Sequence, residues 1–174
     1  DQRGRTDLIF CRDTLPLSQR PDVLVFQTPP LARAVELTGP VIAKLWVSTS
    51  ARDTDFTVKV IDVYPPNEDY PDGFAMNLAD SVLRLRFRNG FDREEFAEPG
   101  MVYPIEIDVG PISNQFMPGH RIRVDVSSSN YPQFDPNTNT AEPLGRERDR
   151  QVARQTVYHD GSRASHVLLP VCGS

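Results

Sequence analysis

The segment Phe56-Thr-Val-Lys-Val-Ile-Asp-Val-Tyr64 alternates its side chains with the period of two that a β-strand requires. Both faces of this strand carry apolar side chains, Val58 and Val60 on one and Ile61 and Val63 on the other. A strand that is apolar on both faces is typical of the middle of a sheet, where each face is covered. We therefore expect this segment to lie at the centre of a β-sheet.

Other short apolar segments alternate with clusters of turn residues, a pattern typical of all-β proteins. We expect about nine strands, at 23–26, 35–49 with a break at Gly39-Pro40, 56–64, 74–78, 82–87, 102–109, 121–127, 155–159 and 165–171. No internal period repeats, and no strand is followed by a glycine-rich turn and an amphipathic helix, which excludes propellers, solenoids and parallel βαβ sheets. The sequence predicts an all-β, two-sheet antiparallel jelly-roll sandwich of the galactose-binding-domain type.

The composition agrees with a single domain that contains little helix. The 174 residues include 16 prolines and 10 glycines, and each proline inside a helix costs about 3 kcal/mol. Only a short helical turn is expected, near residues 146–150. We expect residues 1–21 to be a linker remnant with an N-terminal strand, and residues 22–174 to form one jelly-roll domain.

The charge of the chain limits its partners. A net charge of −5 and a pI near 5.2 argue against nucleic acid and anionic membranes. The sequence shows neither a membrane span nor a signal peptide, and the compartment stays open, with the cytoplasm slightly favoured. The cations are 17 arginines and 2 lysines, and arginine forms bidentate pairs with carboxylates. We expect several arginines to point outward and to bind a neighbouring domain: Arg84, Arg86, Arg88, Arg121 and Arg123.

No pattern of catalytic residues stands out. No serine lies in the Gly-x-Ser-x-Gly elbow that an α/β-hydrolase nucleophile needs. His159 precedes Asp160, but neighbours in a strand point to opposite faces and cannot orient each other readily. No catalytic role is expected for His166 either, and His120, after Pro118-Gly119, is expected to anchor a loop. We therefore expect no catalytic residue in this chain.

A metal site is also not expected, nor is a cofactor site. Asp135, Asn137 and Asn139 have the 1, 3, 5 spacing that begins an EF-hand loop. Thr140 then replaces the required glycine, and Arg146 replaces the glutamate. Asx side chains that hydrogen-bond their own backbone explain these residues more simply.

Two further features leave alternatives open. Cys11 and Cys172 could pair if the two ends of the chain lie side by side, but two separate thiols are the simpler interpretation. Exposed aromatic rings on a jelly roll could bind a sugar. The single tryptophan, Trp46, lies in an apolar segment and is expected in the core.

Several motifs together resemble the C-terminal, non-catalytic domain of the X-Pro dipeptidyl-peptidase and cocaine-esterase-like (CocE/NonD-type) serine hydrolases. These motifs run in order over nearly the whole chain: Asp22 to Leu31, Leu37-Thr-Gly-Pro40, Leu45-Trp-Val-Ser48, Asp53-Thr-Asp-Phe56, Val60-Ile-Asp-Val-Tyr-Pro65, Ala75-Met-Asn-Leu78, Pro118-Gly-His-Arg-Ile-Arg123, Ser127-Ser-Ser-Asn-Tyr-Pro132 and Leu168-Leu-Pro170. An acidic insert at residues 67–71 departs from the family pattern.

The resemblance implies an enzyme with an α/β-hydrolase domain, a helical cap and this jelly roll. The catalytic triad would lie in the first of these, and the catalytic and cap domains would be the partners of the jelly roll in the same polypeptide. A structural or interface role is then expected for His120, Arg121, Arg123, Asn130, Arg84 and Arg86. Two alternatives stay open, a free-standing carbohydrate-binding module and a self-contained enzyme.

Overall fold

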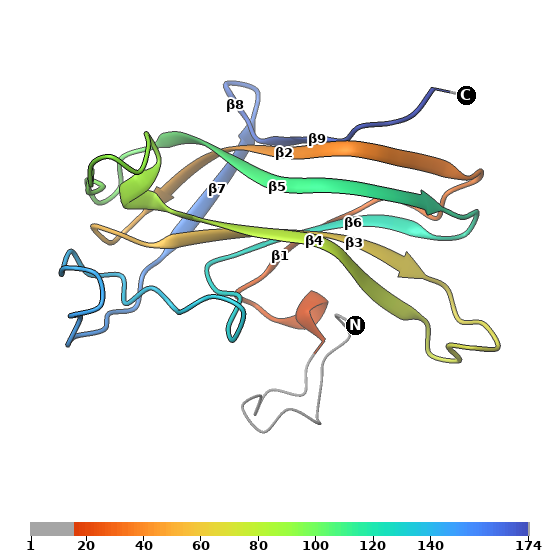
Figure 1. The fold of residues 1–174 in the computed structure, drawn as a ribbon, viewed down its shortest axis with the longest axis horizontal. Coiled ribbons are helices and arrows are strands. Elements are labelled where there is room, and N and C mark those ends of the chain that lie inside the picture. The colour runs from red at the N-terminus through yellow and green to blue at the C-terminus, as the bar shows by residue number, and fades with distance from the viewer. Residues whose placement is uncertain (1–15, 174) are drawn as a thin grey trace.

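The structure, a computed structural model, describes residues 16–173, which form two packed antiparallel sheets (Figure 1). Nine strands and two 3-10 turns follow in the order η1 (Leu17–Gln19), β1 (Leu24–Gln27), β2 (Val35–Thr49), β3 (Asp55–Tyr64), β4 (Phe74–Arg84), η2 (Leu85–Phe87), β5 (Tyr103–Phe116), β6 (Arg121–Ser127), β7 (Gln155–Asp160), β8 (Arg163–Ala164) and β9 (His166–Leu168). The described residues contain no α-helix. The predicted all-β sandwich is confirmed.

One sheet has the strand order β1-β6-β3-β4, and the other has the order β5-β2-β7-β8 with β9 also paired to β2. Strand β3 lies between β6 and β4, so the prediction of a central strand is confirmed. The inner faces of the two sheets supply the hydrophobic core. Its fully buried members include Val58 and Val60 of β3 and Val41 and Val47 of β2.

Strand β2 is continuous, so the expected break at Gly39-Pro40 is wrong. Gly39 adopts a φ of +138° within the strand, which glycine allows. A Cβ added at this position would lie 3.0 Å from the Cβ of Pro170. A bulge between Val41 and Ile42 absorbs the irregularity. Strand β5 likewise continues through Gly110, whose φ of +100° accompanies the same bulge, and does not end at residue 109.

The other boundary errors are smaller. Residues 74–84 form one strand, and 85–87 form a 3-10 turn instead of the end of a second strand. Residues 146–150 are not helical. Of the expected N-terminal segment, residues 1–15 lie outside the described residues, and residues 17–19 form η1.

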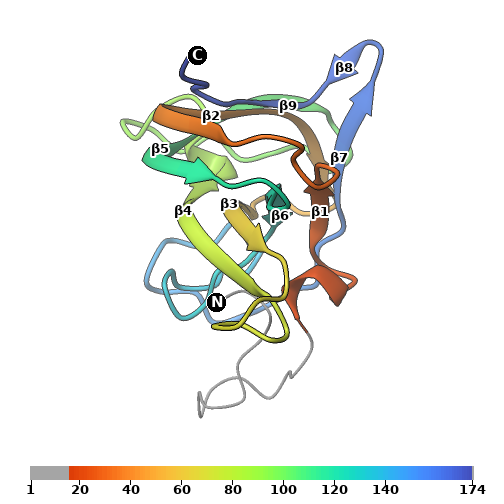
Figure 2. The same cartoon turned by 90° about the vertical axis from the view of Figure 1, so that its right-hand side faces the viewer.

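The last described residues run along one edge of β2 (Figure 2). Strand β9 pairs with residues 42–44. Beyond β9, the backbone N–H of Thr38 donates to the carbonyl of Pro170 at 3.0 Å, and that of Cys172 donates to Glu36 at 3.0 Å. The C-terminal tail therefore completes the five-stranded sheet.

Long connections gather at one end of the sandwich, and we call this region the loop end. It consists of residues 50–54, 88–102 and 128–154 (Figure 1). The β3–β4 and β5–β6 turns lie at the opposite end.

Candidate functional site

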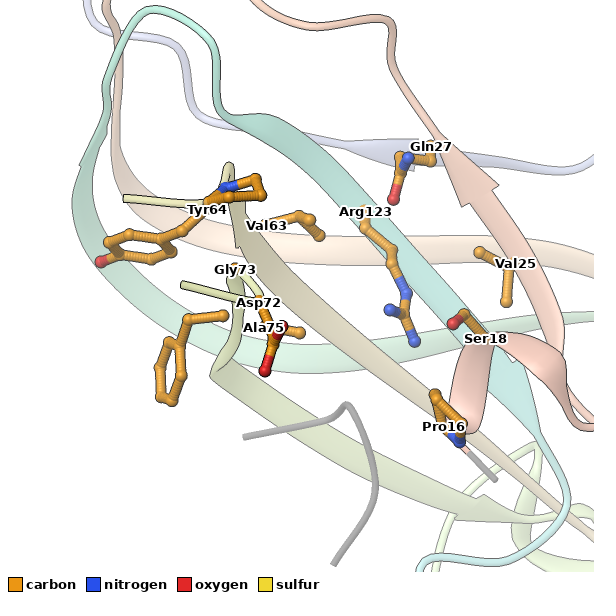
Figure 3. A pocket seen from close by; sticks show the side chains of 12 residues that line it. Pro16, Ser18, Val25, Gln27, Val63, Tyr64, Asp72, Gly73, Ala75 and Arg123 are labelled. Atoms are coloured by element: carbon orange, nitrogen blue, oxygen red, sulfur yellow. The ribbon is translucent and has the colours of Figure 1, made fainter. Parts of the chain in front are cut away.

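The outer face of the four-stranded sheet carries a hollow of about 430 Å³. Its lining comes from η1, β1, the end of β3, the β3–β4 turn and Arg123 of β6, and Figure 3 shows the Arg123 side chain reaching toward Ser18. The guanidinium is already engaged, because its Nε and Nη2 donate to Asp125 at 2.7 and 2.5 Å. The one basic side chain among the described residues that line the hollow is therefore already paired with a carboxylate.

Arg123 lies on the outer face of the sheet as expected, but Arg123 and Asp125 are only 4% and 2% exposed, so Arg123 is not free at the surface to bind another domain. Both side chains point away from the core on the outer face of the sheet, but they are covered there. Lys59 lies opposite Asp125 on one neighbouring strand and opposite Asp80 on the other. Burial lowers the pKa of Lys59, while the charges of Asp80 and Asp125 oppose this change. This charged cluster is part of the folded structure and not a free patch.

Arg86 ties the three parts of the loop end together. Its Nε donates to Asp53 at 2.8 Å, and its Nη1 donates to the Glu94 carboxylate at 3.0 Å. The carbonyls of Thr140 and Glu142 also accept hydrogen bonds from this guanidinium, each at 3.1 Å. Arg86 is 1% exposed and Asp53 is 0% exposed. The expectation that Arg86 points outward is therefore wrong, since it lies beneath the loops and holds them.

A second pair extends this network. Arg84 and Asp55 form a bidentate salt bridge at 2.9 and 3.1 Å, which raises the pKa of Arg84. The Asn137 amide donates to Asp53 at 2.9 Å and to Asp55 at 2.7 Å. Asn139 accepts from Thr54 at 2.8 Å. The two asparagines of the EF-hand-like spacing thus anchor the loop to the sheet.

The other two arginines of the predicted set, Arg88 and Arg121, and Asn130 also have intramolecular partners. Arg121 donates to the carbonyl of Thr28 at 3.0 Å. The Asn130 amide donates to Asp80 at 2.5 Å. The Arg88 guanidinium lies 4.4 Å from the centre of the Tyr103 ring. The six residues expected to have a structural or interface role therefore do not form a single cluster, and their role at an interface stays a prediction.

His120 lies at the opposite end of the sandwich, where it is 9% exposed. Its Nδ1 lies 2.9 Å from Asp62, and the Asn114 amide donates to the other oxygen of that carboxylate at 3.0 Å. The Tyr64 ring lies against the imidazole with centroids 4.3 Å apart. Leu31 donates its backbone N–H to the carbonyl of His120 at 2.8 Å, so this residue holds two connections together.

The other histidines lie apart from His120. His159 makes an edge contact with Phe26, with ring centroids 6.3 Å apart. The Nδ1 of His166 lies 2.7 Å from the carbonyl of Ala164. Within residues 16–173, no hydroxyl or thiol is hydrogen-bonded to a histidine, so these residues show no nucleophile–base pair.

Trp46 is not a core residue, contrary to expectation. It lies on the outer face of β2, half-buried, because the inner face is taken by its buried neighbours Leu45 and Val47. A shallow hollow of about 380 Å³ includes Trp46, Pro104 and His166. Side chains alternate between the two faces of a strand, so placing Leu45 and Val47 in the core puts Trp46 on the outer face.

Some classes of site are absent from the described residues. Among residues 16–173, no three His, Cys, Asp or Glu side chains gather in an arrangement that could hold a metal ion. Cys172 is an exposed thiol, and Cys11 lies outside the described residues. None of the helical segments described is both long and apolar enough to span a membrane.

Residues 5–168 match the model of the X-Pro dipeptidyl-peptidase C-terminal non-catalytic domain. The chain belongs to this domain family. This family description agrees with the resemblance carried by the sequence motifs.

Three relatives illustrate the family domain. Cocaine esterase from Rhodococcus sp. (strain MB1 Bresler) is 42% identical over 161 residues, which cover 91% of this chain and 27% of the esterase. An α-amino acid ester hydrolase is 33% identical, with a TM-score of 0.84 over 90% of this chain and 26% of that chain. An aminopeptidase from a marine sediment Thaumarchaeota archaeon is 31% identical, with a TM-score of 0.84 over 90% and 27%. The family domain thus spans about a quarter of these proteins.

Proposed function

We propose that the family domain is the accessory part of an α/β-hydrolase-type serine hydrolase that cleaves peptide, ester or acyl-amide bonds, and that it docks on the catalytic and cap domains. The observation that carries this proposal is the coverage of the relatives. The chain spans 26–27% of an esterase, an ester hydrolase and an aminopeptidase. About three quarters of each relative therefore lies outside the region that this domain resembles.

The arrangement of buried charges favours a structural role for this domain over a catalytic one. Two of the most buried charged groups, Arg86 and Asp53, fix loops and do not face a cavity. Loops that are fixed in this way present a surface of constant shape, which lowers the entropy lost when another domain binds. Contact with a catalytic domain would in turn hold the active-site entrance in place.

Deletion of residues 22–171 from the full polypeptide tests this proposal. We expect a lower melting temperature and a lower kcat/KM toward activated esters and dipeptide amides. Labelling with a fluorophosphonate, which reacts with an assembled serine nucleophile, reports the fraction of active sites that still form. Unchanged stability, kinetics and labelling in the deletion variant would refute the docking role.

A second candidate, a carbohydrate-binding module, draws on the position of Trp46. An indole ring on the outer face of a sheet can stack on the apolar face of a sugar. Titration of the protein with a panel of oligosaccharides, followed by Trp46 fluorescence, tests this function. A saturable shift in the Trp46 emission, together with a heat of binding in calorimetry that disappears in Trp46→Ala, would support it, and the absence of any heat or shift would reject it.

A further inference from the structure

We propose that the loop end is the surface that binds the catalytic domain, through its exposed apolar side chains and through partner carboxylates that pair with its arginines. This inference rests on the proposed function and adds to it the surface used. Five of the twelve large apolar side chains exposed among the described residues lie in two loops of the loop end: Phe91, Met101, Tyr131, Leu144 and Val152. Val152 and Phe91 are the two most exposed of all twelve, at 94% and 86%.

One of these loops, residues 128–154, carries arginines that have no carboxylate partner. Within residues 16–173, the side chains of Arg146, Arg150 and Arg154 form no ion pair and no hydrogen bond, and all three residues are exposed. A partner with carboxylates at its surface would satisfy them through bidentate hydrogen bonds. The same connection also carries the carboxylates of Asp135, Glu142, Glu147 and Asp149, so its arginines are individual pairing sites and not a positive surface. Exposed apolar side chains together with arginine are typical of protein interfaces.

The loop end is ordered although it lacks regular secondary structure. Residues 128–154 form one long connection. Loops longer than roughly 12–15 residues are uncommon in compact domains unless they have a function. This connection is fixed to the sheet side of the loop end by the hydrogen bonds of Arg86, Asn137 and Asn139. Arg86 is a positioning residue in this arrangement, because it orders the surface without belonging to it.

Cysteine accessibility in the full polypeptide tests the assignment. The variants Val152→Cys and Phe91→Cys place a thiol on the loop end, and Met117→Cys places a control thiol on the β5–β6 turn at the opposite end, where Met117 is 48% exposed. Each protein is treated with a maleimide, and the modified peptide is quantified by mass spectrometry. We expect labelling at positions 152 and 91 to be at least about tenfold slower than at 117, since a domain interface shields side chains from solvent.

Two results would overturn the proposal, and they can be told apart. Rapid labelling at 152 and 91 with slow labelling at 117 would mean that the catalytic domain docks elsewhere, so the proposed function would stand without this surface. Rapid labelling at all three positions, with limited proteolysis releasing the jelly roll intact, would overturn the docking role as well.

The variant Arg150→Glu adds a second readout. Rates of labelling at 152 should rise in this background and stay unchanged in the exposed-arginine control Arg33→Glu.

Discussion

Replacement of Arg86 by methionine should destabilise the protein by about 3–5 kcal/mol, because it leaves a buried carboxylate without its cation. Asp53 is 0% exposed, and it would keep only the hydrogen bonds from the backbone N–H of residue 86 and from Asn137, each at 2.9 Å. The carbonyls of Thr140 and Glu142 would lose their donor as well. Methionine has a similar length and retains apolar contact with the Phe96 ring, which lies 4.9 Å from the guanidinium.

The free energy of unfolding is measured by urea denaturation, followed by Trp46 fluorescence and by circular dichroism. The melting temperature should fall by about 6–20 °C, since each kcal/mol corresponds to about 2–4 °C in a domain of this size. Hydrogen exchange should accelerate in residues 137–142, which Arg86 holds. Arg86→Lys should lose less, about 1–3 kcal/mol, because the ammonium keeps the charge but cannot reproduce the planar fork.

Arg33→Met is the matched control, because Arg33 is exposed and forms no hydrogen bond or ion pair within residues 16–173. We expect it to change stability by less than about 0.5 kcal/mol. A loss below about 1 kcal/mol for Arg86→Met, with no change in exchange at residues 137–142, would refute the view that Arg86 fixes the loop end.

Two other predictions concern a glycine and a surface carboxylate. Gly73→Ala should destabilise the protein by about 1–3 kcal/mol, because its φ is +75° and the added Cβ would lie 2.8 Å from the carbonyl oxygen of Tyr64. Gly161→Ala has open space and should be neutral in the same thermal melt. The Arg163 side chain and then Ser162 hold the pKa of Asp160 well below its usual range. The stabilising contribution of Asp160 is thus present above about pH 4 and lost as the pH falls below it. Arg163→Met should raise this pKa toward the ordinary value in an NMR titration, and an unchanged pKa would contradict the assigned cause.

Alternation of apolar residues was sufficient to predict the fold, because burial on a sheet imposes a period of two. Strand β3 shows this most clearly. The places where strands continue were harder to predict, because glycine and proline interrupt the pattern in both turns and bulges. At Gly39 and Gly110 the backbone bends without leaving the sheet, and only the partner strand decides between these outcomes.

The burial of charged residues was predicted less well. Arg123 and Asp125 are two residues apart and therefore share a face, so their pairing could have been read from the sequence. Asp53 and Arg86 are far apart in sequence, and nothing local indicates that they meet. Asparagines 137 and 139 suggested calcium because their spacing is local, whereas their actual partners lie on β3 and the turn before it.

The pairing of the C-terminal tail with β2 has a consequence for synthesis on the ribosome. Strand β2 is made early, but the edge formed by residues 36–44 finds its partners only in residues 166–172. Until those residues emerge, the edge keeps unpaired backbone groups beside apolar side chains such as Leu37, which is the kind of surface that aggregates. The nascent chain therefore exposes this edge of β2 until residues 166–172 have been translated, and truncation before residue 166 should yield insoluble protein even though most of the core is present.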